Sequence, residues 1–227
     1  MGFNSRLKAL DGKTFGRVKA FAFVLSSVPF LLLALRGWNS WRGQPYNLGA
    51  NPIEFITRDL GDWTLIFLMI TLAVTPARRL SGWPWLIKLR RMLGLFAFFY
   101  VSLHFLTYIW LDQFFDLQDI VKDVIKRPFI TVGFLAFLGL IPLAVTSTNA
   151  MIKRLGGKRW QALHRLVYAI ATLGVVHYWW LVKKDIREPL LYAFILGVLL
   201  GIRLFWNLQK RQRRAGTEVS AVRIVNN

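Results

Sequence analysis

Three histidines, His104, His164 and His177, are the only imidazoles in this chain of 227 residues. His104 lies in the apolar stretch FAFFYVSLHFLTYIW, and the other two lie in the nearly uncharged run RWQALHRLVYAIATLGVVHYWW at residues 159–180. Ionisable side chains in such stretches are costly to bury and usually face a partner, a cofactor or a bundle interior. Neutral imidazole is the least costly of them and a common ligand of haem iron. We therefore weigh iron ligation against two alternatives, interhelical hydrogen bonds and a proton relay.

Counting residues along the helices predicts that two of the histidines lie at one depth. His177 follows His164 by 13 residues, which is roughly 20 Å at 1.5 Å per residue, and His104 follows Arg91 by 13 residues. Because the two helices run in the same direction, we expect His104 and His177 to meet near the outer leaflet as axial ligands of one haem. His164 then lies near the inner leaflet without a histidine opposite it. Arg90 and Arg91 are at its depth and suit haem propionates better than iron.

The spacing between His164 and His177 does not place them on one helical face. Thirteen residues at 100° each leave them roughly 140° apart on an ideal helix. We expect either that the two sites use different faces or that the helix deforms, with Gly174 as the candidate position. A proton relay is less favoured, because relays usually include carboxylates and we expect no Asp or Glu in a helix interior.

The elements that carry these residues are expected to be membrane helices. The chain is 55% hydrophobic, with ten Trp and eighteen Phe, and its apolar residues come in long blocks, which exceeds the needs of a soluble core. The predicted spans are residues 18–35, 60–74, 92–110, 129–145, 161–182 and 189–205. The first is expected to be retained, since no small-residue cleavage site ends it. The fold class is therefore an all-α membrane protein, a six-transmembrane-helix bundle with haem between helices three and five.

Charge placement predicts the orientation of the bundle. The N-terminus, the loops after spans two and four and the C-terminal tail together carry the entire net charge of +19, whereas the opposite side sums to zero. By the positive-inside rule the basic side is cytoplasmic, with both termini inside. The basic residues lie in short juxtamembrane loops, which favours contact with anionic membrane lipids and argues against nucleic acid as a partner.

The remaining sequence divides the chain simply. We expect a cytoplasmic N-terminal segment at residues 1–17, one transmembrane domain at 18–206, and a basic, polar cytoplasmic tail at 207–227 that is loosely ordered beyond its basic cluster. The outward loop after span three is expected to form an interfacial helix within residues 117–125. With no cysteine in the chain, thiol chemistry and iron–sulfur clusters are excluded, so any redox work needs a bound cofactor.

Several stretches resemble the MsrQ (YedZ) family. They are RRMLGLFAFFYVSLHFLTYIWLD at residues 90–112, PARRLSG at 76–82, and residues 130–185, in which RLGGKRWQALHRLVY is the most specific part. The family is the haem-binding membrane subunit of the bacterial MsrPQ protein-methionine-sulfoxide reductase system. It belongs to the wider ferric-reductase-like transmembrane group. The resemblance covers about residues 15 to 205.

The resemblance implies a six-helix electron conduit in the bacterial inner membrane that holds one or two haems b and is associated with FMN. His104, His164 and His177 match the family's three histidines, and Arg90 falls at a position that matters near the inner haem. Electrons would come from the quinone pool or a cytosolic flavin reductase. They would pass to a periplasmic molybdopterin-containing reductase subunit that repairs oxidised proteins, with the two subunits forming a heterodimer.

On this interpretation the chain is an electron-transfer subunit of an oxidoreductase complex with no catalytic residue of its own. One alternative keeps the haem and changes the task, to a metal reductase or another quinol-linked cytochrome b. The other is a proton-coupled transporter with the histidines as a proton path, which predicts a colourless protein.

Overall fold

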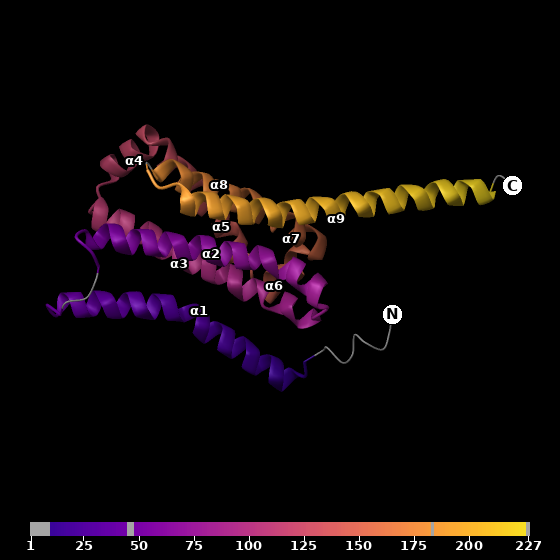
Figure 1. The fold of residues 1–227 in the computed structure, drawn as a ribbon, viewed down its shortest axis with the longest axis horizontal. Helices are drawn as coiled ribbons and strands as arrows, with labels where there is room; N and C mark the ends of the chain where they lie inside the picture. Colours follow the sequence, from indigo (N-terminus) through magenta and orange to yellow (C-terminus); the bar gives the residue numbers. More distant parts are fainter. Residues whose placement is uncertain (1–9, 45–47, 183, 226–227) are drawn as a thin grey trace.

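The structure is a computed structural model that describes residues 10–44, 48–182 and 184–225, with side chains described as far as Arg213. Every regular element in these residues is a helix (Figure 1). The long helices are α1 (Gly12–Trp41), α2 (Pro52–Ser81), α3 (Arg90–Thr107), α5 (Pro128–Val145), α8 (Leu166–Leu181) and α9 (Arg187–Val225). The short elements are the 3₁₀-helix η1 (Pro84–Lys88), the π-helical turn η2 (Tyr108–Asp112), α4 (Leu117–Lys126), α6 (Asn149–Leu155) and α7 (Gly157–Leu163).

Five helical segments in the described residues are long and apolar enough to cross a membrane. They contain the predicted spans one, two, three, four and six. The fifth predicted span is not one helix, because the chain breaks at His164 and Arg165 between α7 and α8. This break, and not Gly174, is where the helix deforms, since α8 runs unbroken through Gly174.

Helix ends differ from the prediction at three places. α1 begins at Gly12, where the Asp11 side chain accepts hydrogen bonds from two backbone N–H groups, which is typical of an N-cap. α2 begins at Pro52 behind the Asn51 cap, so Asp59 and Asp62 lie inside a membrane helix. The expectation that helix interiors lack carboxylates is therefore wrong. The tail is not loosely ordered either, because α9 continues to Val225.

The core is built from two closely packed helix pairs. α2 packs most extensively against α3, and α5 against α8, with further contacts from α3 to α5 and from α2 to α8. Leu72, Ala97 and Ala171, which come from α2, α3 and α8, are fully buried in this core. The packing brings α3 and α8, which carry His104 and His177, into one four-helix unit.

α1 lies beside this unit and is bent, as Figure 1 shows. Pro29 interrupts it, and the Tyr100 hydroxyl of α3 enters the gap, accepting from the Phe30 N–H at 3.2 Å and donating to the Ser26 carbonyl at 2.8 Å. A side chain inserted into the helical hydrogen-bond ladder, together with proline, is a sufficient cause of a kink. The buried Tyr100 therefore fixes both the bend and the attachment of α1.

The two ends of the bundle carry different segments. Figure 1 shows α6, α7, the start of α1 and the far end of α9 at one end, and α4 with the α8–α9 connection at the other. The first end gathers the segments that were predicted to hold the net positive charge. Residues 1–9, which include Arg6 and Lys8, and the side chains of Arg214 and Arg223 lie outside the described part.

Candidate cofactor sites

His104 and His177 lie together in the half of the bundle near α4. The centres of their rings are 6.3 Å apart and the ring planes make an angle of 82°. Metal–imidazole bonds are about 2 Å long, so two imidazoles on opposite sides of one metal have ring centres roughly 6 Å apart. The observed separation fits a shared metal, although the role of the two residues as ligands stays a prediction.

The Nδ1 atom of each ring lies within hydrogen-bonding distance of a backbone carbonyl oxygen. His104 Nδ1 lies 2.8 Å from the Thr57 oxygen on α2, and His177 Nδ1 lies 2.6 Å from the Phe129 oxygen on α5. A carbonyl can only accept, so each Nδ1 carries the proton and each Nε2 has a free lone pair. Metal-binding histidines are oriented by second-shell hydrogen bonds of this kind.

Beside each of these carbonyls, a glycine leaves the space that the histidine ring needs to reach the oxygen. In an α-helix the carbonyl of residue i points toward residue i+4, and the residues four positions after Thr57 and Phe129 are Gly61 and Gly133. A Cβ atom at Gly61 would lie 3.3 Å from the His104 ring, and one at Gly133 would lie 2.7 Å from His177 Nδ1. The sequence gave no signal for Gly61 or for the two carbonyls.

His164 occupies a separate place, at the break between α7 and α8. Its Nε2 lies 3.0 Å from Thr146 Oγ1, and its ring stacks on Trp160 with centres 3.9 Å apart. Trp160 also donates from Nε1 to the Thr146 carbonyl at 2.9 Å. The end of α5 thus holds both aromatic rings, a contact that the sequence did not indicate.

A cavity of about 600 Å³ lies beside His164, in the size range of small-molecule and cofactor sites. Arg90 and Arg91 from the start of α3 line it together with His164, so these three residues lie around one cavity as their depths predicted. Arg91 also donates to the Asn149 side chain at 2.5 Å. Apolar residues from α2, α3, α5 and α8 complete the cavity, which suits a ligand with an apolar body and an acidic end.

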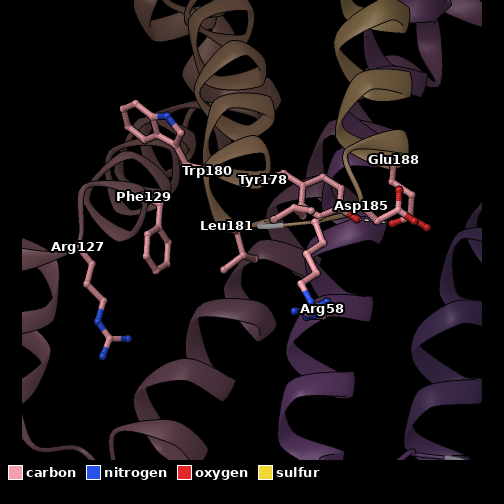
Figure 2. A pocket seen from close by; sticks show the side chains of 10 residues that line it. Arg58, Arg127, Phe129, Tyr178, Trp180, Leu181, Asp185 and Glu188 are labelled. Atoms are coloured by element: carbon pink, nitrogen blue, oxygen red, sulfur yellow. Dashed lines mark hydrogen bonds between the residues drawn. The ribbon is translucent and has the colours of Figure 1, made fainter.

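A second cavity, of about 1050 Å³, opens at the other end of the bundle beside the histidine pair. Phe129 lines it, and the carbonyl of the same residue is the partner of His177. Figure 2 shows Tyr178, Asp185 and Glu188 gathered on one side and Arg127 with Phe129 on the other. The Tyr178 hydroxyl donates to Glu188, and Arg127 is paired with Asp123. This cavity has walls of mixed charge.

Known proteins resemble this chain over most of its length. Residues 60–175 match the family described as ferric reductase like transmembrane component. A protein from Herminiimonas arsenicoxydans is 60% identical over 205 residues, which cover 88% of this chain and 91% of the relative. Relatives from Azospira oryzae (55% identical; 88% of this chain, 82% of the relative) and Ralstonia nicotianae (53%; 87% and 89%) are similar.

All three relatives bear the name "Protein-methionine-sulfoxide reductase heme-binding subunit MsrQ". The matched region contains all of α3, α5 and α7, with His104, His164 and Phe129, whereas Thr57 and His177 lie just outside it. With its apolar helices and these matches, the chain is a multi-pass membrane protein that belongs to the MsrQ family of ferric-reductase-like transmembrane components.

Proposed function

We propose that the chain is the haem-binding electron-transfer subunit of a protein-methionine-sulfoxide reductase system. The observation that carries the proposal is the pairing of His104 and His177, with ring centres 6.3 Å apart and each Nδ1 engaged by a carbonyl. In the described residues no group of three or more His, Asp or Glu could hold a bare metal ion. Two axial imidazoles suit iron whose other ligands belong to a macrocycle.

In this proposal His104 on α3 and His177 on α8 would hold the haem iron, and α2 and α5 would orient the two imidazoles. The carbonyls of Thr57 and Phe129 keep the Nε2 lone pairs free and aligned, and the surrounding apolar side chains exclude water. A bound haem b would supply a one-electron Fe(III)/Fe(II) couple. The chain sets the potential of that couple through the imidazoles, their carbonyl partners and the burial of the site.

The inner cavity is the proposed site of a second cofactor. His164, Arg90 and Arg91 are its proposed binding residues, with His164 as a ligand and the arginines as partners of acidic groups. A second haem b and FMN are the two candidates, the flavin on family resemblance. With one cofactor near each leaflet, an electron could cross the bilayer by moving from one cofactor to the other. No protein side chain could carry the electron across.

The proposed topology is six spans in the bacterial inner membrane with both termini in the cytoplasm. α8 is the span that needs its flanks, since it has 16 residues and about 20 are required to cross the hydrocarbon core. Residues 18–206 form the transmembrane domain, residues 1–17 precede it on the cytoplasmic side with α1 already begun, and residues 207–227 are the cytoplasmic tail, in which α9 continues to Val225.

The proposed partners lie on the two sides of the membrane. A periplasmic molybdopterin-containing reductase subunit would dock near α4 and the outer cavity, close to the histidine pair. The quinone pool or a cytosolic flavin reductase would supply electrons. Anionic lipids would contact the basic end.

The test is the visible spectrum of the detergent-purified protein, oxidised and dithionite-reduced, with a pyridine haemochrome count. We expect a sharp reduced α band with at least one haem per chain. His104→Ala and His177→Ala should each abolish the same low-spin signal, whereas His164→Ala should leave it in place and perturb a different site. Protein that stays colourless when haem is supplied, or outer variants with an intact spectrum, would overturn the proposal.

A further inference from the structure

α2 gives the inner cavity a polar wall, although α2 is an apolar membrane helix. Leu68, Thr71, Thr75 and Arg78 line the cavity. Their spacing of three, four and three residues places them on one face of the helix. None of these residues was predicted to bind a cofactor from the sequence.

Thr71 has a hydroxyl group that the protein leaves unsatisfied. The residue is 5% exposed, and its Oγ1 has no hydrogen-bond partner among the described residues. Threonine in a helix commonly donates to the carbonyl four residues earlier, as Thr64 of the same helix does to Leu60 at 2.8 Å. Burying a hydroxyl without a hydrogen-bond partner costs free energy. A polar atom of a ligand in the cavity would supply the missing partner of Thr71.

Arg78 presents the same feature two turns along the helix. Its Nε is buried and also lacks a partner within the described side chains. Arg90, Arg91 and Arg165 line the same cavity, and its lining includes no Asp or Glu. By contrast, the arginines of the outer cavity are paired, Arg58 with Glu54 at 2.7 Å and Arg127 with Asp123 at 3.3 Å. The inner cavity therefore has excess positive charge that an anionic ligand would neutralise.

We propose that Thr71 and Arg78 bind the cofactor of the inner cavity directly, together with Arg90, Arg91 and His164. The Arg78 Nε–H donates to an acidic oxygen of the ligand, and the Thr71 hydroxyl bonds a second polar atom of the ligand. The two residues are roughly 10 Å apart along the helix, so the ligand is an elongated, flat molecule with an acidic end. This inference rests on the proposed function, because that function assigns a cofactor to the cavity.

Two cofactors share this chemistry, haem through its carboxylates and flavin mononucleotide through its phosphate. The full chain is purified in detergent as the parent, Arg78→Gln and Thr71→Val. Haem is counted by pyridine haemochrome, flavin by fluorescence after acid release, and cofactor-depleted protein is titrated with haemin and with FMN. We expect Arg78→Gln to weaken binding of one of them roughly ten- to a hundredfold, as loss of a hydrogen bond to a charged group predicts. Thr71→Val should weaken the same cofactor by about fivefold.

Two matched controls separate binding from general damage. Arg79→Gln removes the same charge one residue further on, from a side chain that lies over the Trp206 ring at 4.1 Å. Thr64→Val removes a buried hydroxyl that already has its partner. Both controls should bind cofactor as the parent does. In depleted protein, Thr71→Val should melt at or above the parental temperature, because it removes an unsatisfied group, whereas Thr64→Val should melt lower.

The outcomes show which cofactor supplies the acidic group in the inner cavity and whether the proposal holds. Selective loss of haem beyond the His104–His177 haem supports carboxylate binding, and selective loss of flavin supports phosphate binding. Parental affinity for both cofactors in both variants overturns the inference, as does a parent that binds nothing beyond the outer haem. If Arg78→Gln does not yield folded protein, Thr71→Val decides. The low-spin signal of the outer haem is the internal reference, since its absence from the parent would instead overturn the proposed function.

Discussion

At the scale of single residues, the contact between Gly133 and His177 is the tightest constraint on the outer site. We expect Gly133→Ala to displace the imidazole, because the new Cβ would lie 2.7 Å from Nδ1. The hydrogen bond to the Phe129 carbonyl would be lost with the displacement. Losing a second-shell partner typically lowers metal affinity ten- to a hundredfold, so the variant should retain less haem and show a weakened low-spin signal in the reduced spectrum.

Substitutions at two further glycines should affect haem binding less than Gly133→Ala does. Gly61→Ala should be milder, since its Cβ would lie 3.3 Å from the His104 ring. Gly197→Ala on α9 should bind haem as the parent does, because nothing lies within 4 Å of the added atom. Equal haem content in Gly133→Ala and Gly197→Ala would show that the carbonyl contact does not position His177.

Residue counting was sufficient to pair His104 with His177 but not to find what holds them. The rise of a helix is nearly constant, so depth follows from the sequence once a flank is fixed. The carbonyls of Thr57 and Phe129 belong to other helices, and which carbonyl meets which ring depends on how neighbouring helices are rotated and shifted. Gly61, Thr71 and Thr146 were missed for the same reason, since each matters only through a contact across a helix interface.

At the scale of helices, Tyr100 links the bend of α1 to the core. We expect Tyr100→Phe to lower the stability of the detergent-solubilised protein by about 1–2 kcal/mol, because the Phe30 N–H and Ser26 carbonyl lose the hydroxyl that satisfies both. The measurement is thermal unfolding followed by circular dichroism. The haem spectrum should be unchanged, since both hydrogen-bond partners of the lost hydroxyl belong to α1.

Ser27→Ala is the control for this variant. It removes an exposed hydroxyl that bonds the Phe23 carbonyl within α1, so its melting temperature should stay close to that of the parent. A Tyr100→Phe protein as stable as Ser27→Ala would mean that α1 straightens and closes its own hydrogen bond from Phe30 to Ser26.

The apolar blocks predicted where the helices lie but not how they end. Hydropathy reports the part of a helix that contacts lipid, so it missed the beginnings of α1 and α2, which contain charged residues and are capped by side chains. The break at His164 and Arg165 interrupts a segment of even hydropathy and follows from tertiary contacts, the Trp160 stack and the Thr146 bond. The expectation of a loose tail failed because polar composition does not prevent α9 from continuing as a helix to Val225.

At the scale of the whole molecule, the two proposed cofactor sites lie toward opposite ends of the bundle, and the net positive charge lies at one of these ends. The four arginines around the inner cavity come from the basic end, and the outer cavity has acids and bases in its wall. A cofactor with an acidic end is therefore favoured at one end only. This asymmetry followed from the sequence, because it depends on which loops share a side and not on side-chain geometry.

The same asymmetry predicts the orientation in the membrane. With the net charge of +19 assigned to the cytoplasmic side, a fluorescent-protein fusion after Asn227 should fluoresce, since that reporter matures in the cytoplasm. An alkaline phosphatase inserted within α4, at Gln118, should be active, because that enzyme needs the periplasm. A fusion in the turn at Gly156, between α6 and α7, should behave as the C-terminal one does and serves as the internal control. Active phosphatase at Gly156 together with an inactive insertion at Gln118 would invert the topology. It would place the arginine-rich cavity outside the cell and require the electron to travel in the opposite direction.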